Sequence, residues 1–194
     1  RPLTIVYEHL DRVDGSARFG FGSDTALASL SGPIEVRLAS EHPSKATLEV
    51  LVRPLANVPG TASKALAHTL RALLAPALLL ARHPRALVQI VVQACAPSRG
   101  GGGGGQAPPA LVAACINAAA LALLDGVAVP MAGVVCAAAV AKLPSGAFVV
   151  DPGEAEAMGA AGVGCFAFLF AEGGEGAGVV GKAVWTDWRA HGGA

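Results

Sequence analysis

The chain has 194 residues, which is the size of one domain and enough to enclose a substantial core. Its 14 basic and 14 acidic residues cancel, which argues against a free-standing nucleic-acid binder of the strongly basic kind. Hydrophobic residues make up 53% of the chain and charged residues only 14%, against about 25% charged in ordinary soluble domains. This apolar excess indicates large subunit interfaces, although an alanine-rich composition raises the same figure.

The first third of the chain reads as short strands. Residues 14–33 predict a β-hairpin, with arms over 16–21 and 25–30 joined by the turn Gly22-Ser23-Asp24. We expect Gly32-Pro33 to end strand pairing, because proline has no N–H to give to a ladder. Further strands are predicted over residues 4–10, 34–39 and 46–53.

Helices alternate with strands in the rest of the chain. Pro59-Gly60-Thr61 predicts the start of a helix that runs to about Leu80, and a second helix is expected over residues 111–124. The remaining strands are predicted over residues 86–96, 133–143, 147–150, 163–170 and 179–185. This order indicates a single α/β (α+β) domain over residues 1–194, with mixed sheets packed against helices.

A run of glycines, residues 100–105, interrupts this pattern. Glycine has no side chain to pack and maximal backbone freedom, so we predict a flexible loop insertion over residues 98–109. No lysine followed by Ser or Thr comes after the glycines, so a phosphate-binding loop is not indicated. No apolar run reaches the ~18–20 residues that would span a bilayer, and the first residues show no secretory leader.

The cysteines predict no metal site. Cys95, Cys115, Cys136 and Cys165 lie among small and apolar residues, without a CxxC pair and without histidine at ligand spacing. We therefore expect buried, reduced thiols, which fits a cytosolic or nuclear compartment. No cofactor is expected.

One face of the first predicted helix is basic. Lys64, His68 and Arg71 fall at i, i+4 and i+7, within about 60° of arc, and leucines occupy the opposite face. Such a stripe is either an ordinary solvated face or a binding surface for an anionic partner. A second basic cluster, Arg82-His83-Pro84-Arg85, is typical of a solvated turn.

The full hairpin string, with Gly-Ser-Ala on one arm, Thr-Ala-Leu-Ala on the next and Gly-Pro after it, resembles the RNase PH family. These are phosphorolytic 3′-exoribonucleases and their relatives in the RNA exosome ring. The resemblance covers residues 11–188 and implies the RNase PH fold. Further segments are similar to one eukaryotic ring subunit of the family: residues 59–64, 83–85, 114–119 and 124–127, with Pro130-Met131 and 150–152.

The residues that the family's chemistry needs are missing. The resemblance implies a Thr-Arg-Thr phosphate site at the start of the second helix, where this chain has Leu111, Val112 and Ala113. The family's two catalytic aspartates correspond to Gly153 and Ala157. Nearby Glu154 and Glu156 are expected to point to opposite faces of an extended segment, so a shared metal is not predicted.

The resemblance thus implies a catalytically inactive ring subunit. Its partners would be RNase PH-like paralogues in a six-membered ring, RNA-binding cap proteins and a separate catalytic nuclease, in nucleus, nucleolus and cytoplasm. Lys64, His68 and Arg71 would contact RNA phosphates in the channel without sequence preference. The alternatives are a self-associating nuclease whose unrecognised metal site uses Glu154 or Glu156, and another inactive ring subunit of the same family.

Overall fold

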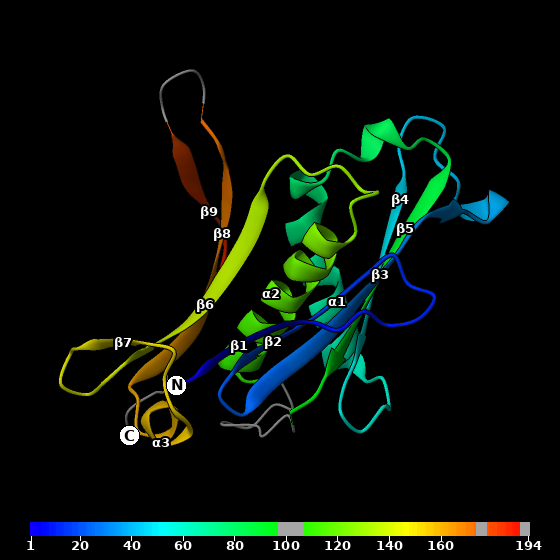
Figure 1. Ribbon diagram of the computed structural model, residues 1–194. Coiled ribbons are helices and arrows are strands. Elements are labelled where there is room, and N and C mark those ends of the chain that lie inside the picture. Colours follow the sequence, from blue (N-terminus) through cyan, green and yellow to red (C-terminus); the bar gives the residue numbers. More distant parts are fainter. Residues whose placement is uncertain (97–106, 174–177, 191–194) are drawn as a thin grey trace.

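Two β-sheets enclose a layer of helices in the computed structural model, which describes residues 1–96, 107–173 and 178–190 (Figure 1). The first sheet has the strand order β1-β2-β3-β5-β4 and the second has the order β7-β6-β8-β9. The first sheet consists of β1 (Leu3–Tyr7), β2 (Gly15–Phe21), β3 (Asp24–Glu35), β4 (Thr47–Arg53) and β5 (Ala86–Ala94). The second consists of β6 (Val134–Lys142), β7 (Phe148–Val150), β8 (Gly162–Glu172) and β9 (Val179–Ala190).

Helix α2 (Pro109–Asp125) is the centre of the molecule and is apolar on every side. It packs on β2, β3 and β5 of the first sheet and on β6 and β8 of the second. A helix that is hydrophobic all round has to be buried, which is the position that α2 occupies between the sheets (Figure 1). Helix α1 (Thr61–Leu74) covers β4 at the edge of the first sheet, and a short helix α3 (Glu154–Met158) follows β7.

Asn117 is the polar exception in the middle of α2 and is buried. Its side-chain amide donates a hydrogen bond to the Ala137 carbonyl oxygen (2.8 Å) and accepts one from the Ala137 N–H (2.7 Å). Both polar ends of the side chain are thereby satisfied by one residue of β6, as burial demands. This pair fixes the position of the second sheet along the central helix.

The C-terminal end of α2 is tied to the first sheet. The Asp125 carboxylate accepts a hydrogen bond from the Ser16 N–H at the start of β2 (2.9 Å). Gly15 allows the close approach, because a Cβ there would lie 2.4 Å from the Ala122 carbonyl oxygen. Helix α2 is thus held by hydrogen bonds to both sheets.

The predicted fold class is confirmed, but several element boundaries were wrong. Strand β3 does not stop at Gly32-Pro33. It reaches Glu35 after a register shift between Ser31 and Ile34, and a bulge of this kind tolerates the missing proline N–H. No separate strand forms over 34–39, where a 3₁₀ turn spans Leu38–Ser40.

The first helix ends at Leu74 rather than near Leu80. Pro76 cannot donate the next helical hydrogen bond, and 3₁₀ turns at Ala75–Ala77 and Leu80–Arg82 follow. Helix α2 begins at Pro109, within the predicted 98–109 loop, since proline suits the first position of a helix. The glycine run itself lies outside the described residues.

The cysteines are only partly as predicted. Cys115 and Cys165 are buried, and burial raises the pKa of each thiol to about 12, so both are protonated at neutral pH. Cys95 is half-buried, and Cys136 is exposed on the outer side of β6, which corrects the expectation that all four are buried. No helix among the described residues is long and apolar enough to cross a membrane.

Removing the Asn117 side chain should destabilise the fold more than its size suggests. Asn117→Ala leaves a buried donor and a buried acceptor of Ala137 without partners, so we expect a loss of about 2–4 kcal/mol in the free energy of unfolding. Urea denaturation measures it, with Ser145→Ala in the exposed β6–β7 turn as control, where less than about 0.5 kcal/mol is expected. Equal stability of both variants would show that the Asn117 contact does not anchor the second sheet.

Candidate functional site

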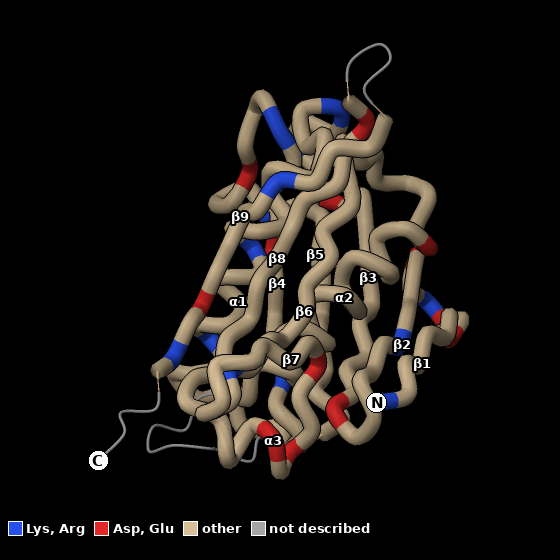
Figure 2. Tube along the Cα trace, turned by 90° about the vertical axis from the view of Figure 1, so that its left-hand side faces the viewer, with Lys and Arg blue, Asp and Glu red and all other residues tan. Residues whose placement is uncertain are grey.

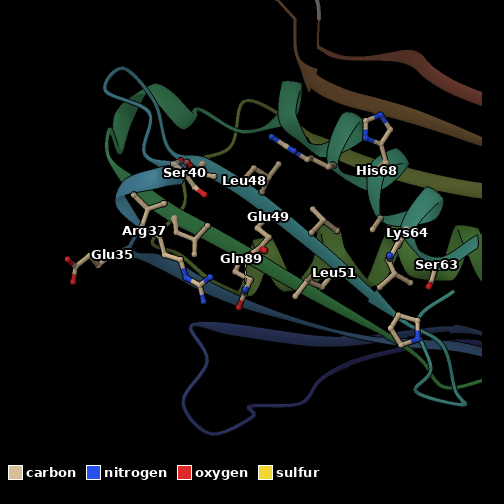
Figure 3. A pocket seen from close by; sticks show the side chains of 18 residues that line it. Glu35, Arg37, Ser40, Leu48, Glu49, Leu51, Ser63, Lys64, His68 and Gln89 are labelled. Carbon is tan, nitrogen blue, oxygen red and sulfur yellow. Dashed lines mark hydrogen bonds between the residues drawn. The ribbon is translucent and has the colours of Figure 1, made fainter. Parts of the chain in front are cut away.

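A groove lies between α1 and the edge strand β4, with a volume of about 840 Å³ (Figure 3). One wall is the exposed side of α1, with Ser63, Lys64, His68 and Arg71. The floor and far side come from β4 and its neighbours, and Arg37 and Ser40 lie at one end of the groove.

The basic wall follows from the amphipathic pattern of α1. The Gly60 N–H donates a hydrogen bond to Ser63 Oγ (3.0 Å), which caps the start of the helix. Leu70, Leu73 and Leu74 are buried, as the leucine face predicted, and this turns Lys64, His68 and Arg71 outward. The structure therefore brings the three predicted residues together in one wall of one groove.

Charges of both signs line the groove. Arg37 adds a fourth basic side chain, while Glu35 and Glu49 supply carboxylates (Figure 3). The Glu49 carboxylate accepts a hydrogen bond from Gln89 Nε2 (2.8 Å). Within the described parts of the chain, Arg37, Lys64 and Arg71 make no ion pair, so their charges are available to a ligand.

Sequence reasoning missed the groove residues that lie outside the basic helix. Glu49 and Gln89 come from β4 and β5, which pair in parallel with these two residues side by side. Arg37 lies just after β3 and reaches the groove because β3 runs on past Pro33. Finding these residues would have required predicting that β4 and β5, which α1 connects in the sequence, pair as neighbours in the sheet. Predicting each strand separately does not give that pairing.

The start of α2, where the resemblance implies the family's phosphate site, is part of the core. Leu111, Val112 and Ala113 are 2%, 5% and 0% exposed and belong to the main hydrophobic cluster. Pro108 and Pro109 precede them at the start of the helix. Apolar side chains in this position offer no hydrogen-bond donor to an anion.

The acidic residues after β7 lie on a short helix and not in the predicted extended segment. Glu154 and Glu156 lie on the helix α3 rather than in an extended segment, because Gly153 starts a helical turn in which Glu156 accepts a hydrogen bond from the Gly153 N–H (2.7 Å). Gly153 and Ala157 carry no metal-binding group. Among the residues that the structure describes, no group of three His, Cys, Asp or Glu side chains could hold a metal ion.

Asp151 is held in an ion-pair cluster. Arg1 pairs with Asp151 and with Asp24 at the start of β3, where its Nη1 lies 2.7 Å from the carboxylate. Hydrogen bonding to Asp151, and then to Asp24, raises the pKa of the Arg1 guanidinium. The cluster joins β1 and β3 of the first sheet to the end of β7 in the second.

The second basic cluster lies on a turn, as predicted. Arg82 ends the 3₁₀ turn Leu80–Arg82, and Arg85 forms an exposed ion pair with Glu41 (3.1 Å). None of its members lines the α1–β4 groove.

Sequence comparison relates the chain to exosome proteins. Residues 1–127 match the family described as "3′ exoribonuclease family, domain 1", RNase PH. The chain is 35% identical over 116 residues to "Exosome complex component rrp46" of Schizosaccharomyces pombe, covering 60% of this chain and 47% of that protein. It is 39% identical over 118 residues to "Exosome complex component RRP46" of Saccharomyces cerevisiae, covering 60% and 51%. The chain spans about half the length of these relatives.

Structure comparison agrees. The crystal structure of rice (Oryza sativa) Rrp46 superposes with a TM-score of 0.75 at 25% identity, over 95% of this chain and 82% of that one. A chain of an archaeal exosome core gives a TM-score of 0.69 at 14% identity, over 98% and 75%, and supports the fold alone. The predicted resemblance to the RNase PH family, and to the exosome component that these relatives name Rrp46, is confirmed.

Introducing the arginine of the family's Thr-Arg-Thr site at Val112, near the start of α2, should destabilise or unfold the protein. Val112→Arg puts an unpaired charge into the core, at an expected cost of about 3–5 kcal/mol. Leu124→Arg is the matched control, because this residue is exposed at the C-terminal end of the same helix, where a cation suits the helix dipole. Thermal unfolding measures both. A Val112→Arg protein as stable as its control would mean that this position is open to solvent and to phosphate.

Proposed function

This chain belongs to the RNase PH family of 3′ exoribonucleases, and from that premise we propose that it is a non-catalytic subunit of an exosome core ring. In this proposal it pairs with paralogous subunits of the same fold and helps to close a six-membered ring. It lines part of the channel that leads RNA to a separate catalytic nuclease, below RNA-binding cap proteins. The ring processes and degrades RNA from the 3′ end in nucleus, nucleolus and cytoplasm.

The observation that carries the proposal is the outer face of the second sheet. Strands β6 and β8 have no charged residue before their last positions, Lys142 and Glu172, and the face is nearly free of charge along its middle (Figure 2). Large apolar side chains remain exposed on it, among them Phe148, Val150, Phe168, Phe170 and Trp188. An antiparallel sheet with one solvated face normally alternates apolar and polar residues, so a sheet that is apolar on both faces is suited to burial on both.

The proposal that the chain is not catalytic is supported by what the corresponding residues do. Leu111, Val112 and Ala113 form core contacts instead of a phosphate site. Asp151 is engaged by Arg1, and Glu156 caps its own helix. These groups therefore already have structural roles, which supports a subunit that binds rather than cleaves.

The basic wall of the α1–β4 groove is the proposed RNA contact. Lys64, His68 and Arg71 are exposed on consecutive turns of one helix, and cationic side chains bind nucleic acid through its phosphates. Contacts to phosphate carry no sequence information, which fits a channel that passes many RNAs.

Affinity purification through this chain tests the assembly. We expect the wild-type chain to recover RNase PH-like paralogues at equal stoichiometry, and Phe168→Lys to lose most of them, because a charge in an apolar interface core is not compensated. Ser145→Lys, in the exposed turn, is the control that should retain them. Native mass spectrometry gives the composition.

Recovery of the wild-type chain as a homodimer would contradict the ring proposal. It would favour the self-associating nuclease if RNA cleavage by that dimer needs magnesium and is lost in Glu154→Ala or Glu156→Ala. If circular dichroism shows that Phe168→Lys does not fold, Phe170→Lys on the same face replaces it as the test variant. The amount of paralogues that Phe170→Lys recovers then decides the outcome.

The RNA contact has its own test. In the assembled complex, Lys64→Ala with Arg71→Ala should weaken oligouridine binding and lower the slope of log K against log salt by about 1.4, since each phosphate contact to a single strand contributes ~0.7. Arg12→Ala with Lys182→Ala removes the same charge away from the groove and should leave the slope unchanged. Equal slopes in the two double variants would show that α1 does not contact the RNA.

A further inference from the structure

The α1–β4 groove runs along a free strand edge. β4 is the last strand of the first sheet, and among the described strands it pairs only with β5. Its residues Thr47, Leu48, Glu49, Val50, Leu51 and Val52 all line the groove. Successive strand residues point to opposite faces of a sheet, so a groove that touches all of them follows the backbone edge itself.

The outward backbone groups of β4 have no hydrogen-bond partner among the described residues. In the described chain, the backbone of Thr47–Arg53 makes hydrogen bonds only within the sheet, to β5. The outward N–H and C=O groups of β4 are therefore left to solvent, which makes such an edge a template for an added strand. Native edges are often protected by a covering helix. Here α1 packs on β4, and the groove still reaches every residue from Thr47 to Val52.

The two sides of the groove differ in charge. A strand added to β4 would place alternate side chains toward α1, where Lys64, His68 and Arg71 stand. Its other side chains would face Glu49, Leu51 and Gln89 on the opposite side of the sheet. Three alternate strand residues span ~13 Å, close to the ~10.5 Å that the helical rise gives from Lys64 to Arg71.

We propose that an extended protein segment with acidic side chains at alternate positions adds as a strand to the free edge of β4. Its carboxylates pair with Lys64, His68 and Arg71, and its backbone completes the hydrogen bonding of β4, as in other cases of strand addition. RNA is the less suited occupant along the strand edge, because Glu35 and Glu49 repel phosphate and no described Phe, Tyr or Trp side chain lines the groove for base stacking.

The segment and RNA use the same basic residues. Occupation by the acidic segment therefore competes with RNA for α1. This competition rests on the proposed function, whereas the strand addition rests on the groove and the edge alone.

A labelled peptide of alternating glutamate and threonine, (Glu-Thr)₄, is the probe for the full chain. Fluorescence anisotropy should show saturable binding, reduced at least tenfold in Lys64→Glu with Arg71→Glu, and unchanged in the control Arg12→Glu with Lys182→Glu. The charge-matched peptides (Lys-Thr)₄ and (Gln-Thr)₄ should bind at least tenfold more weakly. Hydrogen exchange of residues 47–53 should slow when (Glu-Thr)₄ is bound.

Backbone methylation separates strand addition from simple charge attraction. Two peptides of the same charge, N-methylated either at every glutamate or at every threonine, block one edge each. Strand addition predicts that one of them loses binding and the other retains it. Equal binding of both, or unchanged exchange at residues 47–53, would overturn the proposal.

The outcomes also separate this inference from the RNA contact. Oligouridine that slows exchange at residues 47–53, with no binding of (Glu-Thr)₄, would make the edge an RNA site and overturn strand addition. Binding of (Glu-Thr)₄ that oligouridine does not displace would support strand addition and contradict RNA contact by α1.

Discussion

The burial of α2 between two sheets is the constraint on which the rest of the molecule depends. A helix made almost wholly of alanine, leucine, valine, cysteine and isoleucine has no solvent face, so each sheet must cover it. Asn117 converts this non-directional packing into one arrangement, because its amide pairs with both backbone groups of Ala137. The second sheet is thereby placed with its inner face on α2 and its apolar outer face turned away from the domain.

The burial of α2 also determines where polar groups can lie: the start of α2 is apolar, whereas α1 at the margin keeps its charged side chains. The first turn of α2, where a phosphate site would need cations and hydroxyls, supplies Leu111 and Val112 to the core instead. Helix α1 lies at the margin of the first sheet, packs on β4, and keeps a charged outer side next to an unpaired strand edge. Such an arrangement has interaction surfaces at its margins and an apolar centre, which suits a subunit that holds partners and RNA.

Much of the fold and of the basic wall could be predicted from the sequence, because local periodicity and turn residues determine these features. The hairpin at 16–30, the amphipathic α1 and the apolar α2 follow from periodicity and turn residues, and the clustering of Lys64, His68 and Arg71 follows from helical spacing. Register and neighbourhood could not be predicted. The continuation of β3 past Pro33 depends on a bulge opposite β5. The helical turn at Glu154 depends on a cap at Gly153. The exposure of Cys136 depends on which face of the second sheet is covered. The role of the three basic residues stays a prediction.

The measurement that tests this account most directly is a cryo-EM reconstruction of the native complex that contains this chain, with RNA bound. The account predicts the chain in a ring with subunits of its own fold, the outer face of the second sheet covered by protein, and RNA density beside α1. It is contradicted by a homodimer in which the 3′ end of the RNA lies at Glu154 and Glu156 while Phe168 and Phe170 remain in solvent.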